Sequence, residues 1–387
     1  MSSRNIFTIN HVKTLSGIII MYYQNTEPKN DFTLFIKKPV YNPWLKWISL
    51  ASVLTASALM FYSTQMFGTS EITNLSVSYG DLFDEDKLNL FEEFKQKFSK
   101  HYDIDEENVR FENFKNFLTR VDANNLEEQT GGKGLANHGI TKFADLSADE
   151  FKTNYLGYIA PILETRNIVS VVGEATTTVM DWSGIYTTAV KDQGYCGSCW
   201  AFSATEQIES DSIRLGLLSA DYEMSPEQIV QCDTVDDGCD GGNTATAFEY
   251  VQKAGGLQSD ADYPYTSYYD VTGTCVSNSS EYVVTVSSYY SIGGEENMAT
   301  HVLTTGPLSI CLSAETWATY TSGILTTCPT EVDHCVQAVG VNLDDNYWIV
   351  RNSWGTDWGL DGYIWLEYGS DLCSIAYDPK YVKTELV

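Results

Sequence analysis

Hydrophobic and polar positions predict that the N-terminal part of the chain is built from helices. Residues 81–130 have the period of two helices, the second of which runs from about Asp105 to Asn125. The stretch 130–139 contains four glycines and then breaks the helical pattern. The first helix should pack through one apolar stripe, which is formed by Leu88, Phe91, Phe94 and Phe98.

The C-terminal part is predicted to be helical first and rich in strands later. One helix is expected from Cys199 to Gly216. A second helix at 225–232 has Ser225 as its N-cap and Gln228 in the position that completes a capping box. Strands are expected after it at 282–290, 307–314, 334–343 and 346–354, with a turn between the last two.

Charge and cysteine content change near Thr176. From this residue on, the chain holds 30 acidic and 6 basic residues, a net charge of −24, and it holds all nine cysteines. Clustered cysteines favour disulfides in an oxidising compartment over reduced thiols in the cytosol. Residues 157–180 are rich in Gly, Val, Thr and Ser and have no helical period, so we expect a linker and a domain boundary there.

The overall composition argues against two classes of protein. The 43% of hydrophobic residues is enough for a sizeable core, which argues against a wholly disordered chain. The formal net charge of −29 repels phosphate backbones, and we therefore expect no nucleic-acid partner.

An uncharged, largely apolar segment at 47–70 precedes the first predicted helix. Six Lys or Arg residues come before it and acidic residues follow it, which by the positive-inside rule places the rest of the chain in the lumen. A cleaved signal peptide and an uncleaved signal anchor fit equally well, and a buried core helix is the third interpretation. In a secretory compartment, Asn74 and Asn278 would be glycosylation acceptors.

One cysteine is placed for nucleophilic chemistry. Cys199 begins a predicted helix, where backbone N–H groups and the helix dipole lower the pKa of a thiol. Of the two histidines beyond residue 176, His301 lies in a predicted helix without polar neighbours and is interpreted as structural, whereas His334 begins a strand beside Asp333. An imidazole can hold a thiolate as an ion pair and later protonate a leaving amine, and Asn352 can orient that imidazole.

These residues resemble the papain and cathepsin family of cysteine peptidases. The stretch 193–202, QGYCGSCWAF, is similar to the cysteine signature of the family, and His334 and Asn352 follow Cys199 by 135 and 153 residues. The resemblance implies a cathepsin L-like endopeptidase in which Cys199 is the nucleophile, His334 is the base and acid, and Asn352 is the orienting residue beneath Trp354.

The resemblance also implies an oxyanion hole and a substrate cleft. The Gln193 amide and the backbone N–H of Cys199 would stabilise the oxyanion. Asp378 would lie at the floor of the pocket for the second residue before the scissile bond, which would let a basic residue enter beside bulky apolar ones. The residues that would contact substrate are Gly241, Gly242, Asn243, Thr244, Cys311, Val332, Asp333, Cys335, Trp354 and Asp378.

The disulfides of the family would carry over as Cys196–Cys239, Cys232–Cys275 and Cys328–Cys373. In the fold of the family, Cys311 and Cys335 would lie on adjacent strands at the same pocket, where relatives usually have small or aliphatic residues. We predict that these two form a fourth disulfide, which leaves Cys199 as the single free thiol.

The first part of the chain resembles the inhibitory propeptide of the cathepsin L group. Its first motif is matched on one helix face, with Phe117 where the family usually has Asn, and its second motif is matched with Thr141 in place of another Asn. The matching residues are Glu106, Arg110, Phe114, Val121 and Asn125 in the first motif, and Gly139, Phe143 and Asp145 in the second.

Three other functions are weighed against a peptidase. A thiol-disulfide oxidoreductase would need Cys196 and Cys199 to pair beside a βαβ unit, which the pattern lacks. A catalytically silent scaffold would be expected to lack the cysteine, histidine or asparagine, all of which are present. Acyl transfer to an amine uses the same acyl-enzyme and stays open. The acidic stretch 233–242 lacks the spacing of a calcium loop, so neither a metal nor a cofactor is expected.

The expected fold class is α+β, a papain-like two-domain fold with a helical left domain and a β-barrel-like right domain, preceded by an α-helical inhibitory propeptide. The expected domains are a leader at 1–80, the propeptide at 81–160, a linker with the activation cleavage at 161–175 and the peptidase at 176–387. Expected partners are protein and peptide substrates, the chain's own propeptide and cystatin-like inhibitors, with membrane contact only through 47–70 and a monomeric mature enzyme. A lysosome, a vacuole or the extracellular space is the expected location. In acid, protonation of carboxylates, Asp145 among them, is expected to weaken the binding of the propeptide.

Overall fold

The computed structural model describes residues 78–161, 168, 169, 171 and 173–387, together with the backbone of 8–15, 18–24 and 35–37. It divides into two units, Met1–Asp81 and Leu82–Val387. In the first unit, β1 (Thr8–Leu15), β2 (Ile18–Gln24) and β3 (Phe35–Lys37) form an antiparallel sheet, and the short helix η1 spans Tyr79–Asp81. The segment predicted as a signal peptide or anchor, 47–70, lies outside the described residues. Among the helices that the structure describes, none has the length and apolar character needed to cross a membrane.

The second unit begins with the predicted helices, α2 (Asp84–Lys97) and α3 (Ile104–Thr130), and continues with α4 (Ala148–Tyr155). Phe91 and Phe94 of the predicted stripe are buried, whereas Leu88 is 45% exposed. The two buried rings pack on Phe114 of α3 at 5.3 and 5.5 Å between centroids. An aromatic core therefore holds α2 and α3 together.

Four further helices belong to the C-terminal part: α5 (Cys199–Arg214), α6 (Pro226–Cys232), α7 (Thr244–Ala254) and α8 (Glu295–Thr304). The capping box predicted at α6 is only half formed. The Ser225 hydroxyl accepts a hydrogen bond from the backbone N–H of Gln228, but the Gln228 side chain does not return it. That side chain instead bonds the backbones of Gly256 and Gln258, because the Ser225 N–H already donates to the Gln258 carbonyl.

Ten strands of the second unit form one sheet in the order β4-β9-β12-β11-β10-β8-β13-β7-β5, with β6 paired to β10. The four predicted strands are present as β7, β8, β10 and β11, whereas β4, β5, β6, β9, β12 and β13 were not predicted. The strands are β4 (Ala136–His138), β5 (Ile168–Val169), β6 (Val179–Asp181), β7 (Val284–Ile292), β8 (Leu308–Leu312), β9 (Tyr320–Leu325), β10 (His334–Asn342), β11 (Tyr347–Arg351), β12 (Tyr363–Glu367) and β13 (Lys380–Leu386).

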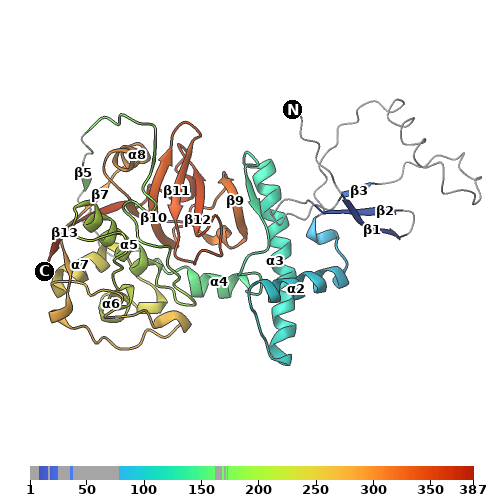
Figure 1. The fold of residues 1–387 in the computed structure, drawn as a ribbon, viewed down its shortest axis with the longest axis horizontal. Coiled ribbons are helices and arrows are strands. Elements are labelled where there is room, and N and C mark those ends of the chain that lie inside the picture. Colours follow the sequence, from blue (N-terminus) through green and yellow to red (C-terminus); the bar gives the residue numbers. More distant parts are fainter. Residues whose placement is uncertain are drawn as a thin grey trace, which may run out of the picture. The chain divides into compact units, whose positions relative to one another are not determined.

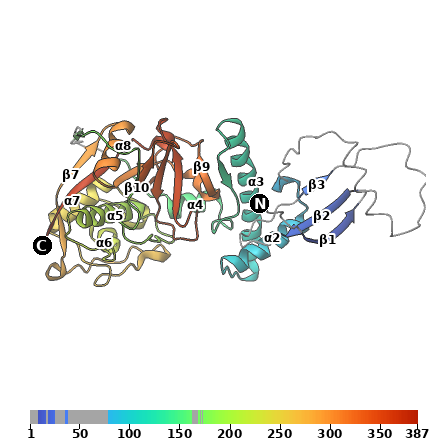
Figure 2. The same ribbon diagram turned by 45° about the horizontal axis from the view of Figure 1, so that its top comes forward.

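Helix α5 lies in the middle of the peptidase region, where it contacts β8, β10 and β13 as well as α6 and α7. Both views show α5, α6 and α7 gathered on one side and the strands β9 to β12 on the other (Figures 1 and 2). Almost every residue of α5 is buried, including polar ones, which pair with the sheet. Ser203, for example, donates to the carbonyl of Val336 at 2.7 Å. This packing holds the first residue of α5 close to the first residue of β10.

The N-terminal helices join the peptidase region through its sheet. Strand β4 pairs antiparallel with the edge strand β9, and α3 lies beside β9 in both views (Figures 1 and 2). Glu128 of α3 is buried, and its carboxylate accepts hydrogen bonds from the backbone N–H and the hydroxyl of both Thr326 and Thr327, at 2.6 to 2.9 Å. The N-terminal helices are thus held by a strand addition and a fully bonded buried carboxylate.

Candidate active site

Cys199 is the single free cysteine among the described residues, and its side chain is fully buried. It is the first residue of α5, as predicted, but its pKa is not lowered in this state. Burial raises the pKa of the Cys199 thiol to about 12, against the opposing effect of backbone N–H groups that include those of Cys335 and Gly157. With this raised pKa, the buried thiol stays protonated at physiological pH.

His334 and Asn352 come together at the start of β10 and just after β11. The Nε2 atom of His334 lies 2.8 Å from Oδ1 of Asn352. The imidazole is fully buried and packs on the indole of Trp354, with 4.8 Å between ring centroids. Burial lowers the pKa of His334 to about 4, although the Asn352 side chain and the Tyr155 backbone both favour the charged ring. In this covered state the imidazole is therefore neutral.

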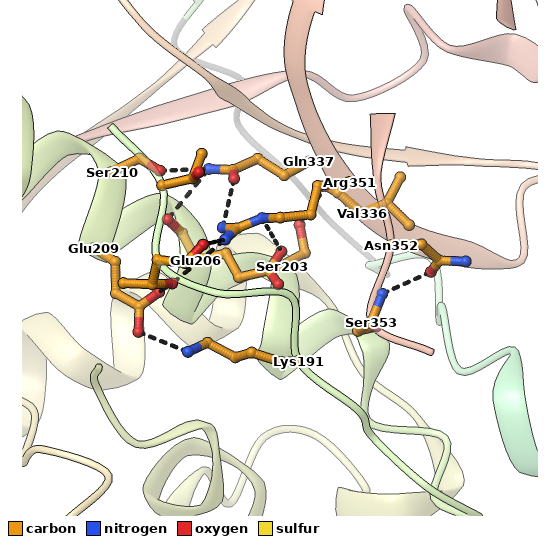
Figure 3. Close-up of polar contacts among 12 residues, drawn as sticks. Lys191, Ser203, Glu206, Glu209, Ser210, Val336, Gln337, Arg351, Asn352 and Ser353 are labelled. Carbon is orange, nitrogen blue, oxygen red and sulfur yellow. Dashed lines mark hydrogen bonds and ion pairs between the residues drawn. The ribbon is translucent and has the colours of Figure 1, made fainter. Parts of the chain in front are cut away.

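A buried polar network holds this pair of strands against α5 (Figure 3). The Arg351 guanidinium donates to Oε1 of Gln337 at 2.7 Å and to the carbonyl of Thr188 at 2.9 Å, and its Nε lies 3.6 Å from Glu206. Burial raises the pKa of Glu206 to about 7, although the positive charge of Arg351 opposes the rise. Since Arg351 precedes Asn352, the network fixes the backbone that carries the asparagine.

Gln193 lies beside the cysteine and is fully buried. Its Nε2 atom donates to the carbonyls of Cys196 at 2.9 Å and of Tyr155 at 3.2 Å. Its Oε1 atom accepts from the Ser353 hydroxyl at 2.7 Å, which fixes the amide orientation. The donor that sequence reasoning assigns to an oxyanion hole is thus in contact with a carbonyl of the N-terminal helical region.

The segment after α4 runs through the expected substrate cleft. The backbone N–H of Tyr158 donates to the carbonyl of Asp333 at 3.0 Å, and Gly242 exchanges hydrogen bonds of 2.8 Å with Gly157 and Ile159. Tyr158 and Gly242 form a parallel bridge. Of the other predicted contact residues, Gly241 also faces Gly157, and Asn243 donates to the Ile159 carbonyl at 3.4 Å and caps α7 at Thr244.

Tyr158 packs on a hydrophobic cluster that includes two residues of the expected specificity pocket, Cys311 and Cys335. Its ring lies 6.2 Å from that of Tyr377, and Val332 packs on the same cluster, which also contains Cys199. Asp378, the residue expected at the floor, is buried and forms an ion pair with Lys380, which is buried as well. The carboxylate is therefore charge-compensated by a residue that sequence reasoning did not single out.

The structure contains four disulfides: Cys196–Cys239, Cys232–Cys275, Cys311–Cys335 and Cys328–Cys373. Cys196 is bonded to Cys239 and not to Cys199, so the two cysteines of the C-x-x-C stretch do not form the redox pair of an oxidoreductase. Cys311 and Cys335 are opposite each other on β8 and β10. Among the described residues, no group of three or more His, Cys, Asp or Glu side chains is placed to hold a metal ion.

Both propeptide motifs form contacts within the N-terminal helices and with the peptidase region. Arg110 pairs with Glu106 at 3.0 Å and with Glu150 of α4 at 2.9 Å, and Asp145 pairs with Lys100 at 3.0 Å. Phe114 and Val121 are buried, and Asn125 exchanges hydrogen bonds with the backbone of His138. The second motif reaches the catalytic region, because Gly139 donates to the Thr319 carbonyl and Phe143 packs edge-on against Trp354 at 5.3 Å.

Each of the two departures from the propeptide motifs makes a local contact. Phe117 is fully buried in the apolar face of α3, and the Arg120 guanidinium lies over its ring. The Thr141 hydroxyl donates to the carbonyl of Ala318 at 2.5 Å. His301, interpreted as structural, packs on the ring of Tyr381 in the helix and sheet region away from Cys199.

Two family models match the chain. Residues 176–383 match "Papain family cysteine protease" and residues 91–151 match "Cathepsin propeptide inhibitor domain (I29)". The chain is 35% identical over 336 residues to "Cysteine proteinase 1" of Dictyostelium discoideum, which covers 78% of this chain and 93% of that protein. It is also 35% identical over 300 residues to the "Viral cathepsin" of Orgyia pseudotsugata multicapsid polyhedrosis virus, covering 74% of this chain and 89% of that protein.

Solved structures are similar over the same region. The digestive procathepsin L2 proteinase from the larval midgut of Tenebrio molitor superposes with a TM-score of 0.68 at 30% sequence identity, covering 77% of this chain and 99% of that one. The recombinant stem bromelain precursor gives a TM-score of 0.66 at 29% identity, with coverage of 77% and 99%.

Proposed function

Because the chain belongs to the papain family of cysteine proteases, we propose that its endopeptidase activity is carried by Cys199, His334, Asn352 and Gln193. The protein is a cysteine endopeptidase of the cathepsin L type with a propeptide inhibitor domain. The 2.8 Å contact between His334 Nε2 and Asn352 Oδ1 is the observation that supports the assignment, because it orients the imidazole of the residue before Cys335, whose backbone N–H bonds the single free thiol.

The reaction follows from this arrangement. His334 accepts the proton of the Cys199 thiol through Nδ1, the ring nitrogen that does not face Asn352, and the sulfur attacks the scissile carbonyl. The Gln193 amide and the backbone N–H of Cys199 donate to the oxyanion. The tetrahedral intermediate collapses to an acyl-enzyme as His334 protonates the leaving amine, and water, deprotonated by the same imidazole, hydrolyses the thioester.

Inhibition of the zymogen has a direct physical cause. The Tyr155 carbonyl accepts a hydrogen bond from the side-chain amide of Gln193. Gly157 lies so close to the backbone before Cys199 that a Cβ atom on Gly157 would be 1.8 Å from the Gly197 carbonyl oxygen. The covering segment also buries both reactive groups, which keeps Cys199 protonated and His334 neutral. Removing the segment lets water and substrate return, so that the thiolate and imidazolium pair can form.

The pocket that holds Tyr158 sets the proposed substrate preference. A carboxylate at its floor would favour a basic residue only if its charge were available, and Lys380 compensates the charge of Asp378. We therefore propose that this pocket binds a neutral aromatic or aliphatic side chain at the second position before the scissile bond. The ring of Tyr158 is such a side chain.

The domain limits, location and partners complete the proposal. Cleavage in 161–175 would separate the propeptide, residues 81–160, from the peptidase at 176–387 after a leader at 1–80. Disulfide-bonded proteases of this family are typically secretory, lysosomal or extracellular, and an acidic lysosome or vacuole suits the charge of −24 on the mature domain. A monomeric mature enzyme would be open to cystatin-like inhibitors, and 47–70 would provide the membrane contact.

The test is conversion of the full-length zymogen at pH 4.5, followed by mass and by hydrolysis of a fluorogenic peptide, with Cys199→Ala in parallel. The wild type is expected to give an active species that begins near Thr176, and the alanine variant is expected to stay intact and silent. If wild-type protein trimmed by trypsin were also silent, the assignment would fail and a scaffold role would replace it. An added amine nucleophile tests whether acyl transfer accompanies hydrolysis.

A further inference from the structure

The zymogen contains an occupied cation pocket on the surface of the peptidase domain. The ammonium group of Lys142, from the propeptide, lies 3.0 Å from Oδ2 of Asp192, 3.0 Å from Oδ1 of Asp357 and 2.7 Å from the carbonyl oxygen of Trp354. The Lys142 side chain is only 13% exposed. Three acceptors for three N–H bonds satisfy the ammonium completely.

All three acceptors belong to the peptidase domain, and Asp192 is held by a bond that does not involve the lysine. The other oxygen of Asp192, Oδ1, accepts from the backbone N–H of Gly194 at 3.0 Å, which leaves Oδ2 directed to the pocket. Gly355 provides the floor. It has a φ of +74°, and a Cβ atom there would lie 2.9 Å from Asp192 Oδ2 and 3.2 Å from Asp357 Oδ1, so the two carboxylates converge over this glycine.

The pocket lies on one defined side of the reactive cysteine. Asp192 precedes Gln193 and forms an antiparallel bridge with Trp354, whose indole packs on His334. The covering segment contacts Gln193 through Tyr155, the Cys199 thiol through Gly157 and Gly242 through Ile159, so that along this segment Gly242 and Gln193 are on opposite sides of Cys199. Gly242 bridges to Tyr158, whose pocket is proposed to take the second residue before the scissile bond, and the pocket at Asp192 therefore faces residues after that bond.

We propose that the mature enzyme uses this pocket to bind a lysine or arginine side chain of the substrate on the leaving-group side of the scissile bond. The inference rests on the proposed function. Loss of Lys142 leaves two carboxylates directed at one point, and a cationic side chain that takes its place removes their mutual repulsion. The enzyme thus gains a specificity element for basic residues outside the pocket that holds Tyr158.

The experiment uses enzyme activated from the full-length chain and internally quenched peptides that differ in one residue. Lysine is compared with norleucine, which has a similar length and no charge, at each of the first three positions after the scissile bond. The ratio of kcat/KM for lysine over norleucine is expected to be about tenfold at one of these positions and to fall in 0.5 M salt. In Asp192→Asn and in Asp357→Asn the ratio is expected to approach one.

Asp344→Asn is the matched control, because it removes one exposed carboxylate in the turn between β10 and β11 and should keep the wild-type ratio. A wild-type ratio near one at all three positions, or a ratio that both pocket variants retain, would overturn the inference. A peptidyl-aminocoumarin has no amino acid after the scissile bond and separates the two claims. If the wild type cleaves it without any lysine preference in the peptides, only the inference fails, whereas no cleavage of either substrate refutes the proposed function and the inference with it.

Discussion

His138 should weaken propeptide docking as the pH falls. The residue ends β4, the strand that the propeptide adds to the sheet of the peptidase, and it is 8% exposed, with its Nδ1 2.8 Å from the Thr319 hydroxyl. Burial lowers the pKa of His138 from 6.5 to about 4, although the nearby Glu128 carboxylate acts in the opposite direction. The docked state therefore excludes a proton that the released, solvated histidine would bind.

The sign and size follow from linkage. A depressed histidine pKa leaves docking at full strength above pH 6.5 and weakens it as the pH falls toward 4, because only the released state is protonated in that range. With the pKa values of 6.5 and about 4, docking is weaker at pH 4.5 than at neutral pH by about 2.5 kcal/mol. This corresponds to a decrease of roughly 70-fold in the docking equilibrium constant. His138→Gln keeps a hydrogen-bonding side chain and removes the titration.

Amide hydrogen exchange of β4 measures the pH dependence of propeptide docking directly. The Cys199→Ala zymogen prevents self-processing, and protection of the amides at 136–139, corrected for intrinsic rates, is compared at pH 7 and pH 4.5. The fall in protection should be steeper in the protein that keeps His138 than in the His138→Gln variant, by a factor of about 50 to 100. His101→Gln is the control, because His101 is exposed and should not change the profile. Equal falls with and without the His138→Gln substitution would refute the reasoning.

Three further predictions concern the catalytic region. Gly157→Ala places a methyl group against the Gly197 carbonyl and should give a zymogen that hydrolyses a fluorogenic peptide at pH 7 before any processing; a silent variant would show that the segment can shift. Arg351→Met leaves the buried Glu206 and Gln337 without their partner, which costs about 3 to 5 kcal/mol and should lower Tm by roughly 6 to 20 °C in calorimetry, whereas an unchanged Tm would contradict this account. Lys380→Met should raise the kcat/KM ratio of Arg over Leu substrates at the second position before the scissile bond, and a ratio equal to wild type would exclude Asp378 from the pocket.

Local signals were enough to predict most helices and the buried strands. The apolar stripes and the N-cap at Ser225 define α2, α3 and α6, and the run from His334 to Asn342 is apolar enough to be recognised as β10. Helix α7 was missed although its signals are present, since Asn243 caps its start and Gly255 ends it in a left-handed conformation. Strand β13 carries Lys380 and Thr384 in its buried face, so its alternation of apolar and polar residues was hard to recognise.

The proposed catalytic residues could be predicted because the stretch around Cys199 and its offsets to His334 and Asn352 match a family pattern, whereas the residues that cover them could not. Lys142 meets Asp192 and Asp357 across 50 and 215 positions of sequence, and no motif of the sequence indicated these contacts. The lowered pKa expected for Cys199 was wrong for the zymogen for a similar reason. A helix N-terminus favours a thiolate, but desolvation by burial outweighs it, and burial depends on residues that are remote in sequence.

The net charges of the two parts do not by themselves favour release of the propeptide in acid. Residues 81–160 hold 17 acidic and 10 basic residues, a net charge of −7, and they dock on a domain of net charge −24. Lowering the pH protonates carboxylates and weakens this repulsion, so the overall charge opposes release in acid. Release also moves a proton from Cys199 to His334, but this exchange conserves the number of bound protons and has no pH dependence of its own. His138 differs from the carboxylates and from the Cys199 and His334 pair, because it is neutral in the docked state and binds a proton when the propeptide is released. Its protonation therefore has the correct sign to drive activation in an acidic compartment.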